Sequence, residues 1–217
     1  MPGNYNKVAR YYDFLSRLVF RKSIVKAQVG LLKFIPANSS MLIVGGGTGW
    51  VLEEISKIHP EGLQITYVEI SSVMIELSQK RDYKKNKVQF VNQPFENYVD
   101  NSKYDIVLTA FLFDNFLENK ILFIFNKLDE LLKNEGIWLF ADFAYKKNKA
   151  LIWQKLLLKT MYLFFRLTCN IEARGLTNMS VFFTPHYDKI FEAYYYSRFI
   201  KSTAYKKNEN RQAMENA

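Results

Sequence analysis

The sequence Met-Leu-Ile-Val-Gly-Gly-Gly-Thr-Gly-Trp, residues 41–50, decides the fold of this 217-residue chain. A short apolar run precedes four glycines within five positions, and a segment with helical spacing of apolar residues follows at 51–58. This order predicts a strand, a tight turn and a helix, because glycine adopts the positive φ angles that such a turn requires. The free N–H groups at the start of the helix can then contact an electron-rich ligand.

A second apolar run, residues 63–68, ends at the carboxylate of Glu69. In that position a carboxylate can accept hydrogen bonds from both hydroxyls of a ribose. The dinucleotide pattern G-x-G-x-x-G would require a glycine at position 50, where Trp50 stands, and a bulky indole there would obstruct a pyrophosphate. The glycine turn and Glu69 therefore predict an adenosyl cofactor that has an amino-acid tail and no phosphates.

Strands and helices alternate along the rest of the chain. Apolar runs predict strands at 88–91, 105–109 and 137–142, and helical spacing predicts helices within 6–34 and at 71–80, 117–132, 149–169 and 185–191. A closing antiparallel strand or hairpin is expected within 194–205. Because near-continuous apolar strands that alternate with helices form parallel sheets covered on both faces, we expect an α/β, Rossmann-like, doubly wound sheet. Such sheets bind ligands beyond the carboxyl ends of their strands.

Four motifs, in the order of the family, resemble the class I S-adenosylmethionine-dependent methyltransferases. They are residues 42–49, residues 67–71 with Met74, residues 104–108 and residues 136–140. The opening Val-Ala-Arg-Tyr-Tyr-Asp-Phe-Leu at residues 8–15 is similar to the start of quinone-biosynthesis and related small-molecule methyltransferases. The resemblance implies a mostly parallel seven-stranded sheet with an antiparallel edge element and helices on both faces.

One methyltransferase domain over residues 1–205 accounts for the sequence, followed by a polar tail at 206–217. Within it we expect an N-terminal helical lid at 1–35 and a substrate-side helical insertion at 145–185. The implied cofactor is S-adenosyl-L-methionine, held by the glycine turn, the ends of the next strands and the lid. The residues expected to bind it are Gly45, Gly46, Gly47, Thr48, Gly49, Glu69, Ile70, Met74, Gln93, Pro94, Phe95, Thr109, Ala110, Phe111 and Tyr12.

Two positions depart from the family pattern. Ile43 stands where members usually carry an acidic residue that helps to orient the amino-acid end of the cofactor. Pro94 stands where an aspartate often accepts the adenine amine, although Gln93 could accept that bond. These departures leave open a methyltransferase fold that binds the cofactor weakly and serves as an interaction module.

The function that we expect is methyl transfer from S-adenosylmethionine to a small apolar or aromatic acceptor. Tyr12 and Phe111 are candidates for aromatic contact with the cationic sulfonium. Asp114, Asp142 and His186 are candidate bases, but each has a structural role available, so the catalytic residues are unknown. A nucleotide-dependent oxidoreductase is the disfavoured alternative, because Trp50 interrupts the dinucleotide pattern.

Composition limits the remaining possibilities. One cysteine, Cys169, and two histidines give no pattern for a disulfide framework or a metal site. We expect a cytoplasmic protein, since no signal peptide or membrane-spanning run is recognisable. The net charge of +9 is attributed to solvated surface lysines, with no nucleic-acid module.

The apolar segment at 149–169 has three interpretations. A buried helix over the substrate pocket is favoured, because its apolar coverage exceeds a single stripe. Peripheral contact with a membrane is the second, since cationic residues interrupt the segment. A homodimer contact is the third.

Overall fold

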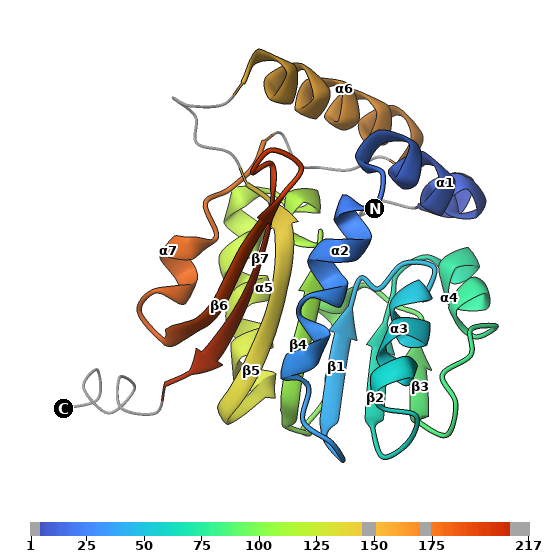
Figure 1. The fold of residues 1–217 in the computed structure, drawn as a ribbon, viewed down its shortest axis with the longest axis vertical. Helices are drawn as coiled ribbons and strands as arrows, with labels where there is room; N and C mark the ends of the chain where they lie inside the picture. Colours follow the sequence, from blue (N-terminus) through green and yellow to red (C-terminus); the bar gives the residue numbers. More distant parts are fainter. Residues whose placement is uncertain (1–4, 145–150, 170–174, 209–217) are drawn as a thin grey trace.

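The computed structural model describes residues 5–144, 151–169 and 175–208. They form a seven-stranded sheet of order β3-β2-β1-β4-β5-β7-β6 with helices on both faces (Figure 1), as the sequence predicts. The strands are β1 (Ser40–Val44), β2 (Gln64–Val68), β3 (Lys87–Val91), β4 (Tyr104–Ala110), β5 (Leu132–Phe143), β6 (Tyr187–Tyr195) and β7 (Ile200–Lys207). The α-helices are α1 (Ala9–Phe20), α2 (Ser23–Val29), α3 (Trp50–Ile58), α4 (Ser72–Ser78), α5 (Glu118–Leu131), α6 (Ile152–Cys169) and α7 (Ser180–Phe183). Short 3₁₀ turns are η1 (Tyr5–Lys7), η2 (Leu32–Phe34), η3 (Phe95–Asn97) and η4 (Phe113–Asn115).

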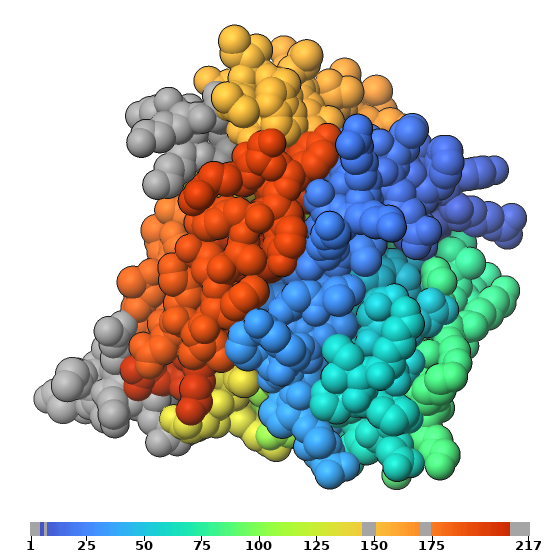
Figure 2. Space-filling view, in the orientation of Figure 1, coloured from blue at the N-terminus to red at the C-terminus, as the bar shows by residue number. Residues whose placement is uncertain are grey.

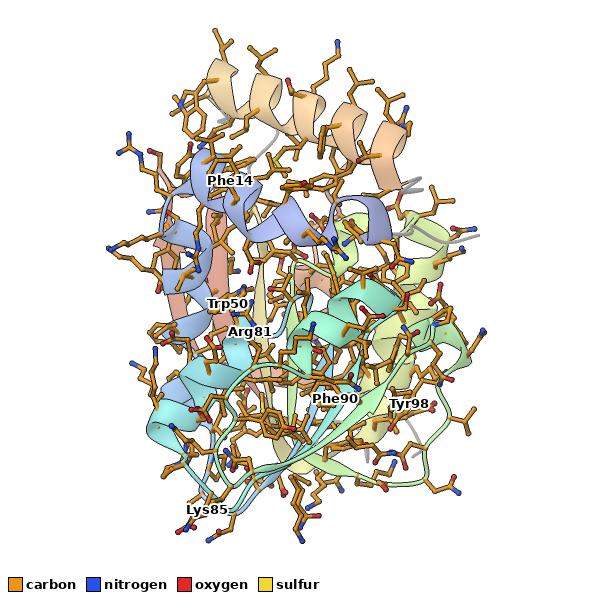
Figure 3. The ribbon with its side chains drawn as sticks, turned by 90° about the vertical axis from the view of Figure 1, so that its right-hand side faces the viewer. Phe14, Trp50, Arg81, Lys85, Phe90 and Tyr98 are labelled. Carbon is orange, nitrogen blue, oxygen red and sulfur yellow. The ribbon has the colours of Figure 1, made fainter. Side chains whose placement is uncertain are left out.

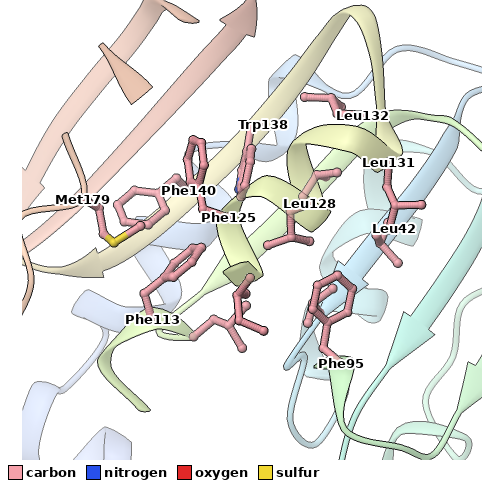
Figure 4. Packing of buried hydrophobic residues seen from close by; sticks show 14 of the residues in the cluster. Leu42, Phe95, Phe113, Phe125, Leu128, Leu131, Leu132, Trp138, Phe140 and Met179 are labelled. Carbon is pink, nitrogen blue, oxygen red and sulfur yellow. The ribbon is translucent and has the colours of Figure 1, made fainter. Parts of the chain in front are cut away.

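The first five strands of the chain run parallel, and both faces of the central strands are buried. On β1 the side chains of Leu42 and Val44 pack toward α5, whereas those of Met41 and Ile43 pack toward α3. Strand side chains alternate between faces, so an uninterrupted apolar run is the pattern of a strand covered on both sides. Figure 4 shows the α5 side of this core, where Phe125 stacks on Trp138 with ring centroids 5.0 Å apart.

The closing hairpin is antiparallel, with β7 between β5 and β6. Its first strand begins earlier than predicted, so the helix expected at 185–191 is wrong. The preceding helix α7 ends at Phe183, and from Tyr187 onward the backbone pairs with β7, beginning at Lys207. Pairing with β7 therefore overrides the local helix signal around Pro185.

Two helices lie over the carboxyl edge of the sheet and not on either face of it. Figure 1 shows α6 beyond the ends of the strands with α1 beside it. Phe165 of α6 contacts the rings of Tyr5 and Tyr12. Only Gln154, Leu158 and Cys169 of α6 are buried, so the expectation of a buried helix at 149–169 is wrong for most of its described length. No helix among the described residues is both long and apolar enough to cross a bilayer.

Candidate functional site

A cavity opens at the carboxyl edge of the sheet, where the strand order reverses between β1 and β4. This reversal is the place where open α/β sheets bind ligands. Its walls come from the sheet edge and from the overlying η1 and α1. The residues that line it include Tyr5, Tyr12, Asp13, Ser16, Gly45–Thr48, Trp50, Glu69, Ile70, Met74, Gln93–Glu96, Ala110–Leu112, Asn115 and Phe116.

The glycine turn forms the floor of this cavity. Gly45, Gly47 and Gly49 have φ angles of 68°, 65° and 77°, in the left-handed region that favours glycine. Gly46 is required for a different reason, because a Cβ there would lie 2.4 Å from the ring of Tyr67. The Tyr67 hydroxyl donates to the carbonyl oxygen of Gly47 at 3.0 Å and so supports the turn from below.

Glu69 joins the end of β2 to the glycine turn. Its carboxylate is 5% exposed and accepts hydrogen bonds from the Gly47 N–H at 3.1 Å and the Ser71 N–H at 2.9 Å. Burial raises the pKa of Glu69, and these backbone donors oppose the rise. The acid therefore faces the cavity, as the sequence predicts, and it is already held in place by the main chain.

A cluster of Asp13, Thr48 and Arg81, here called the clasp, connects the lid to the glycine turn. The Thr48 hydroxyl donates to the Asp13 carboxylate, with Oγ1–Oδ2 at 2.8 Å. Arg81 donates through Nε to the Thr48 carbonyl at 2.9 Å and through Nη2 to Asp13 Oδ2 at 3.3 Å. Figure 3 labels Arg81 on the glycine-turn side of α1. The clasp fixes the inner face of α1 over the cavity.

The 3₁₀ turn η1 closes the other end of the cavity. Tyr5 donates to the Asn115 side-chain oxygen, and the Ser71 hydroxyl donates to Asn6 Oδ1 at 2.6 Å. Burial raises the pKa values of Tyr5 and Tyr12, so both hydroxyls are neutral at physiological pH. The N-terminal segment thus contacts both η4 and the start of α4.

The structure brings together nearly all residues that the sequence predicts for the site. Gly45, Gly46, Gly47, Thr48, Glu69, Ile70, Met74, Gln93, Pro94, Phe95, Ala110, Phe111 and Tyr12 line the cavity. Two predicted residues do not. Thr109 points to the α5 side of β4, where it accepts from Trp138 Nε1 at 2.9 Å, because neighbouring strand residues face opposite sides. Gly49 is turned toward α4, since its Cβ would lie 2.5 Å from that of Ser78.

Sequence reasoning missed several lining residues from the lid, from η3 and from the segment around η4 that follows β4. They include Tyr5, Asp13, Ser16, Glu96, Leu112, Asn115 and Phe116. Tyr5 donates a hydrogen bond to Asn115, 110 positions away in the sequence, and no local sequence pattern predicts such a contact. Trp50 also lines the cavity, and its place directly after the glycine turn was the available signal.

Two carboxyl groups that are candidate bases, Asp114 and Asp142, lie beside the cavity but are not among its lining residues. Asp142, 4% exposed, accepts from the Phe143 N–H at 2.7 Å, and Asp114 accepts from Asn115 Nδ2 at 2.9 Å. Burial, followed by the charge of Asp142, raises the pKa of Asp114. Burial also raises the pKa of Asp142. His186 lies between α7 and β6, where its backbone N–H donates to the Phe183 carbonyl.

Comparison with known proteins adds independent information. Residues 42–138 match the methyltransferase-domain family model, a range that holds the glycine turn and Glu69. A malonyl-[acyl-carrier protein] O-methyltransferase of Bacillus cereus is 28% identical over 149 residues, which are 67% of this chain and 53% of that protein. A carboxy-S-adenosyl-L-methionine synthase of Nautilia profundicola is 29% identical over 143 residues, 64% of this chain and 60% of that protein. The chain therefore spans about half the length of the curated relatives that it matches first.

Solved structures share the fold at low sequence identity. The N-methyltransferase NodS of Bradyrhizobium japonicum, in complex with S-adenosyl-L-homocysteine, superposes with a TM-score of 0.61 at 10% identity. That match covers 86% of this chain and 84% of the other. In its seven-stranded sheet, its glycine turn and its matched methyltransferase segment, the chain is similar to the class I S-adenosylmethionine-dependent methyltransferases.

Proposed function

We propose that this protein binds S-adenosylmethionine in the cavity described above and transfers its methyl group to a small apolar or aromatic acceptor. The observation that carries the proposal is the meeting of the glycine turn and a buried, cavity-facing Glu69 in one cavity. Either feature alone would be weak support. Together they match what an adenosyl group with an amino-acid tail requires from a protein.

The residues present fit such a group. A Cβ added to Gly47 would meet a single heavy atom within 4 Å, the Met74 sulfur at 3.9 Å, so the turn leaves open space above it. Glu69 supplies a carboxylate that can accept from ribose hydroxyls. Ile70, Gln93 and Phe95 offer apolar and amide groups for the adenine, and the Thr48 side of the turn would hold the amino-acid end.

The absence of an acid at position 43 does not leave the glycine turn without a nearby carboxylate. Ile43 is fully buried between β2 and β4, and the clasp brings another carboxylate, Asp13, to the glycine turn. Asp13 is thereby a candidate to orient the amino-acid end in place of the missing acid.

The cofactor, when bound, supplies an electrophilic methyl group on a cationic sulfur. The chain's part is to orient the reactants and exclude water, which contributes on the order of 7–11 kcal/mol in favourable cases. Tyr12 and Phe111 both line the cavity and can face a cation with their rings. Phe111 is held in a left-handed conformation, φ 53°, by a hydrogen bond from its N–H to the Ala141 carbonyl at 2.8 Å.

The chemistry of the walls argues against an anionic acceptor. Among the described residues that line the cavity, three are carboxylates, Asp13, Glu69 and Glu96, and none is Lys, Arg or His. A substrate carboxylate, such as the malonyl group in the names of the Bacillus relatives, would need a cation that these walls do not supply. Tyrosine, tryptophan and phenylalanine rings instead give an apolar, aromatic lining.

Titration calorimetry with S-adenosylhomocysteine tests the proposal, with thermal shift in NAD⁺ and NADP⁺ as the comparison. We expect micromolar binding of the adenosyl compound and no shift with the dinucleotides. No heat with S-adenosylhomocysteine in a folded sample would reject the cofactor assignment. Binding without methyl transfer to any of a panel of phenols, catechols and lipid-soluble hydroxyaromatics would favour the interaction-module alternative.

The predicted cytoplasmic location and the predicted homodimer stay predictions of the sequence. Of the three interpretations of residues 149–169, the exposure of α6 supports peripheral contact with a membrane over a buried helix.

A further inference from the structure

The outer sides of α1 and α6 present large apolar side chains to solvent. On α1 these are Tyr11, Phe14 and Leu18, each about two-thirds exposed, and on α6 they are Ile152, Leu156, Leu163 and Leu167, between 57% and 86% exposed. We call these seven side chains the lid face. Figure 2 shows α6 and α1 next to each other at one end of the molecule. Exposed apolar patches of this kind mark contact sites for proteins or membranes.

The lid face follows from regular amphipathic helices. Tyr11, Phe14 and Leu18 recur at helical spacing on α1, while Tyr12, Asp13 and Ser16 on the other side of the helix line the cavity. On α6 the same division separates the four exposed residues from the buried Gln154, Leu158 and Cys169. The two helices contact each other through Tyr12 and Phe165. Each helix therefore has one side on the protein and one apolar side without a described partner.

Positive charge flanks this apolar surface. Arg10 and Arg17 of α1, and Lys155, Lys159 and Arg166 of α6, are all exposed. The sequence of α6 contains no Asp or Glu, and Asp13, the one acidic residue of α1, is bound to Thr48 and Arg81 in the clasp. Apolar side chains flanked by Arg and Lys are the composition of helices that lie in the interface of an anionic membrane.

We propose that the lid face docks on the surface of an anionic lipid bilayer, with α1 and α6 lying in the plane of the headgroups. Charge complementarity favours this occupant over a second copy of the chain, because a symmetric dimer would place five cations opposite five cations. Neither helix has the length and apolarity to cross the bilayer, so the contact is peripheral.

Docking would place the bilayer one helix diameter from the cavity, about 10 Å, since α1 contributes to both surfaces. This consequence rests on the proposed function: a lipid-soluble acceptor could pass from the bilayer to the cavity along the contact between α1 and α6. The docking itself depends on the exposed residues alone.

Vesicle co-sedimentation of the full chain tests the proposal. We expect binding to phosphatidylcholine vesicles that contain phosphatidylglycerol, at least about tenfold tighter than to phosphatidylcholine alone, and a decrease as salt rises. The apolar variant Phe14→Ser, Leu18→Ser, Leu156→Ser, Leu167→Ser should lose most of this binding. Its matched control, Ile58→Ser, Val99→Ser, Leu122→Ser, Val181→Ser, changes four apolar residues elsewhere that are 48% to 83% exposed, and it should bind as the unmodified chain does.

A second pair of variants tests the charge. Lys155→Gln, Lys159→Gln, Arg166→Gln should abolish the preference for phosphatidylglycerol, whereas Lys57→Gln, Lys84→Gln, Lys85→Gln should keep it. Figure 3 shows Lys85 at the end of the molecule opposite to α1. Both triple variants lose the same net charge, so a difference between them reports position and not total charge.

The proposal is overturned if the folded chain does not bind anionic vesicles, or if controls and lid-face variants lose binding equally. Sedimentation velocity adds another contrary outcome: a stable dimer that the apolar variant dissociates, without vesicle binding, would make the lid face a self-association surface. Calorimetry with S-adenosylhomocysteine on the same variants keeps the two proposals separate. Retained vesicle binding with no S-adenosylhomocysteine binding would reject the proposed function and leave the docking intact.

Discussion

The two walls of the cavity are built in opposite ways. The sheet wall, from the glycine turn to Glu69, is half-buried to buried, and the Glu69 carboxylate accepts from the main-chain N–H groups of Gly47 and Ser71. The lid wall, from η1 and α1, has its inner side on the cavity and its outer side exposed to solvent. It is attached to the sheet wall through side chains, chiefly the clasp and the contacts of Tyr5 and Asn6.

This difference indicates which wall binds the cofactor and which wall controls access to the cavity. A wall that main-chain hydrogen bonds hold in place is preorganised, so it can bind a cofactor without rearranging. A wall attached by partly exposed side chains opens at low cost, and local openings of this kind occur well below the free energy of global unfolding. We therefore expect substitutions in the sheet wall to affect stability and cofactor affinity strongly. Substitutions in the lid should affect access.

The largest effect is expected for Gly49→Ala. Its φ of 77° costs an alanine about 1–2 kcal/mol, and overlap with Ser78 adds about 1–3 kcal/mol. The Ser78 Cα lies 2.7 Å from the added Cβ, and backbone atoms cannot move away easily. Thermal denaturation should show a Tm lowered by roughly 5–15 °C.

Gly47→Ala is the matched control, because its φ of 65° is similar but its Cβ would enter open space. We expect a stability loss of about 1–2 kcal/mol and a larger loss of S-adenosylhomocysteine affinity, since the methyl group occupies the cavity. Equal losses of stability in the two variants would show that the packing against Ser78 does not matter.

Glu69→Ala should weaken S-adenosylhomocysteine binding by about 1.5–3 kcal/mol, roughly 10- to 150-fold, through loss of a charged acceptor. The variant also leaves the N–H groups of Gly47 and Ser71 without their carboxylate. Glu69→Gln keeps one oxygen acceptor, so its S-adenosylhomocysteine affinity in calorimetry should lie between those of the unmodified chain and Glu69→Ala. A folded Glu69→Ala protein with unchanged affinity would remove the ribose role.

The buried carboxyl groups of Asp114 and Asp142 should make stability depend on pH. Burial raises the pKa of Asp142 from 3.8 to about 7, so the folded state holds protons that the unfolded state has released. Stability therefore falls as pH rises from about 4 to about 7, by at most about 1.4 kcal/mol per pH unit for each extra proton. Above about pH 7, Asp142 is ionised in both the folded and the unfolded state, so its contribution to the pH dependence of stability ends.

Asp142→Asn should flatten this decline, because its amide stays neutral and its oxygen can still accept from the Phe143 N–H. The measurement is Tm for both proteins between pH 5 and pH 8, where the difference should favour the variant at the alkaline end. Parallel curves would mean that the pKa of Asp142 is not raised in the folded protein.

Sequence reasoning succeeded where function and fold share a local pattern. The glycine turn, Glu69 and the strand ends at Gln93 and Phe111 follow one another in βα units, so their convergence could be predicted from strand order alone. The prediction that Thr109 lines the site was wrong, because it located the end of β4 correctly but did not assign the sheet face of each residue.

The lid could not be predicted to the same depth. Asp13 binds a residue 35 positions away and Tyr5 one 110 positions away, and both contacts depend on tertiary packing. The strand β6 was mistaken in part for a helix because it lies at the edge of the sheet, half exposed, with a register shift between Lys189 and Phe191. Such a strand lacks the continuous apolar run that identified β1 and β4.

The smallest effect is expected at the clasp, where the two walls meet. Asp13 and Arg81 are each about a quarter exposed, so their ion pair should contribute about 0.5–1 kcal/mol, less as salt increases. Asp13→Asn should leave Tm nearly unchanged while amide hydrogen exchange in α1 accelerates, because the lid opens without unfolding of the sheet. A double-mutant cycle with Arg81→Gln isolates the pair from the Thr48 hydrogen bond to Asp13. If exchange accelerates equally in α1 and in β1, the lid and the sheet unfold together, and the distinction between a fixed wall and an opening wall fails.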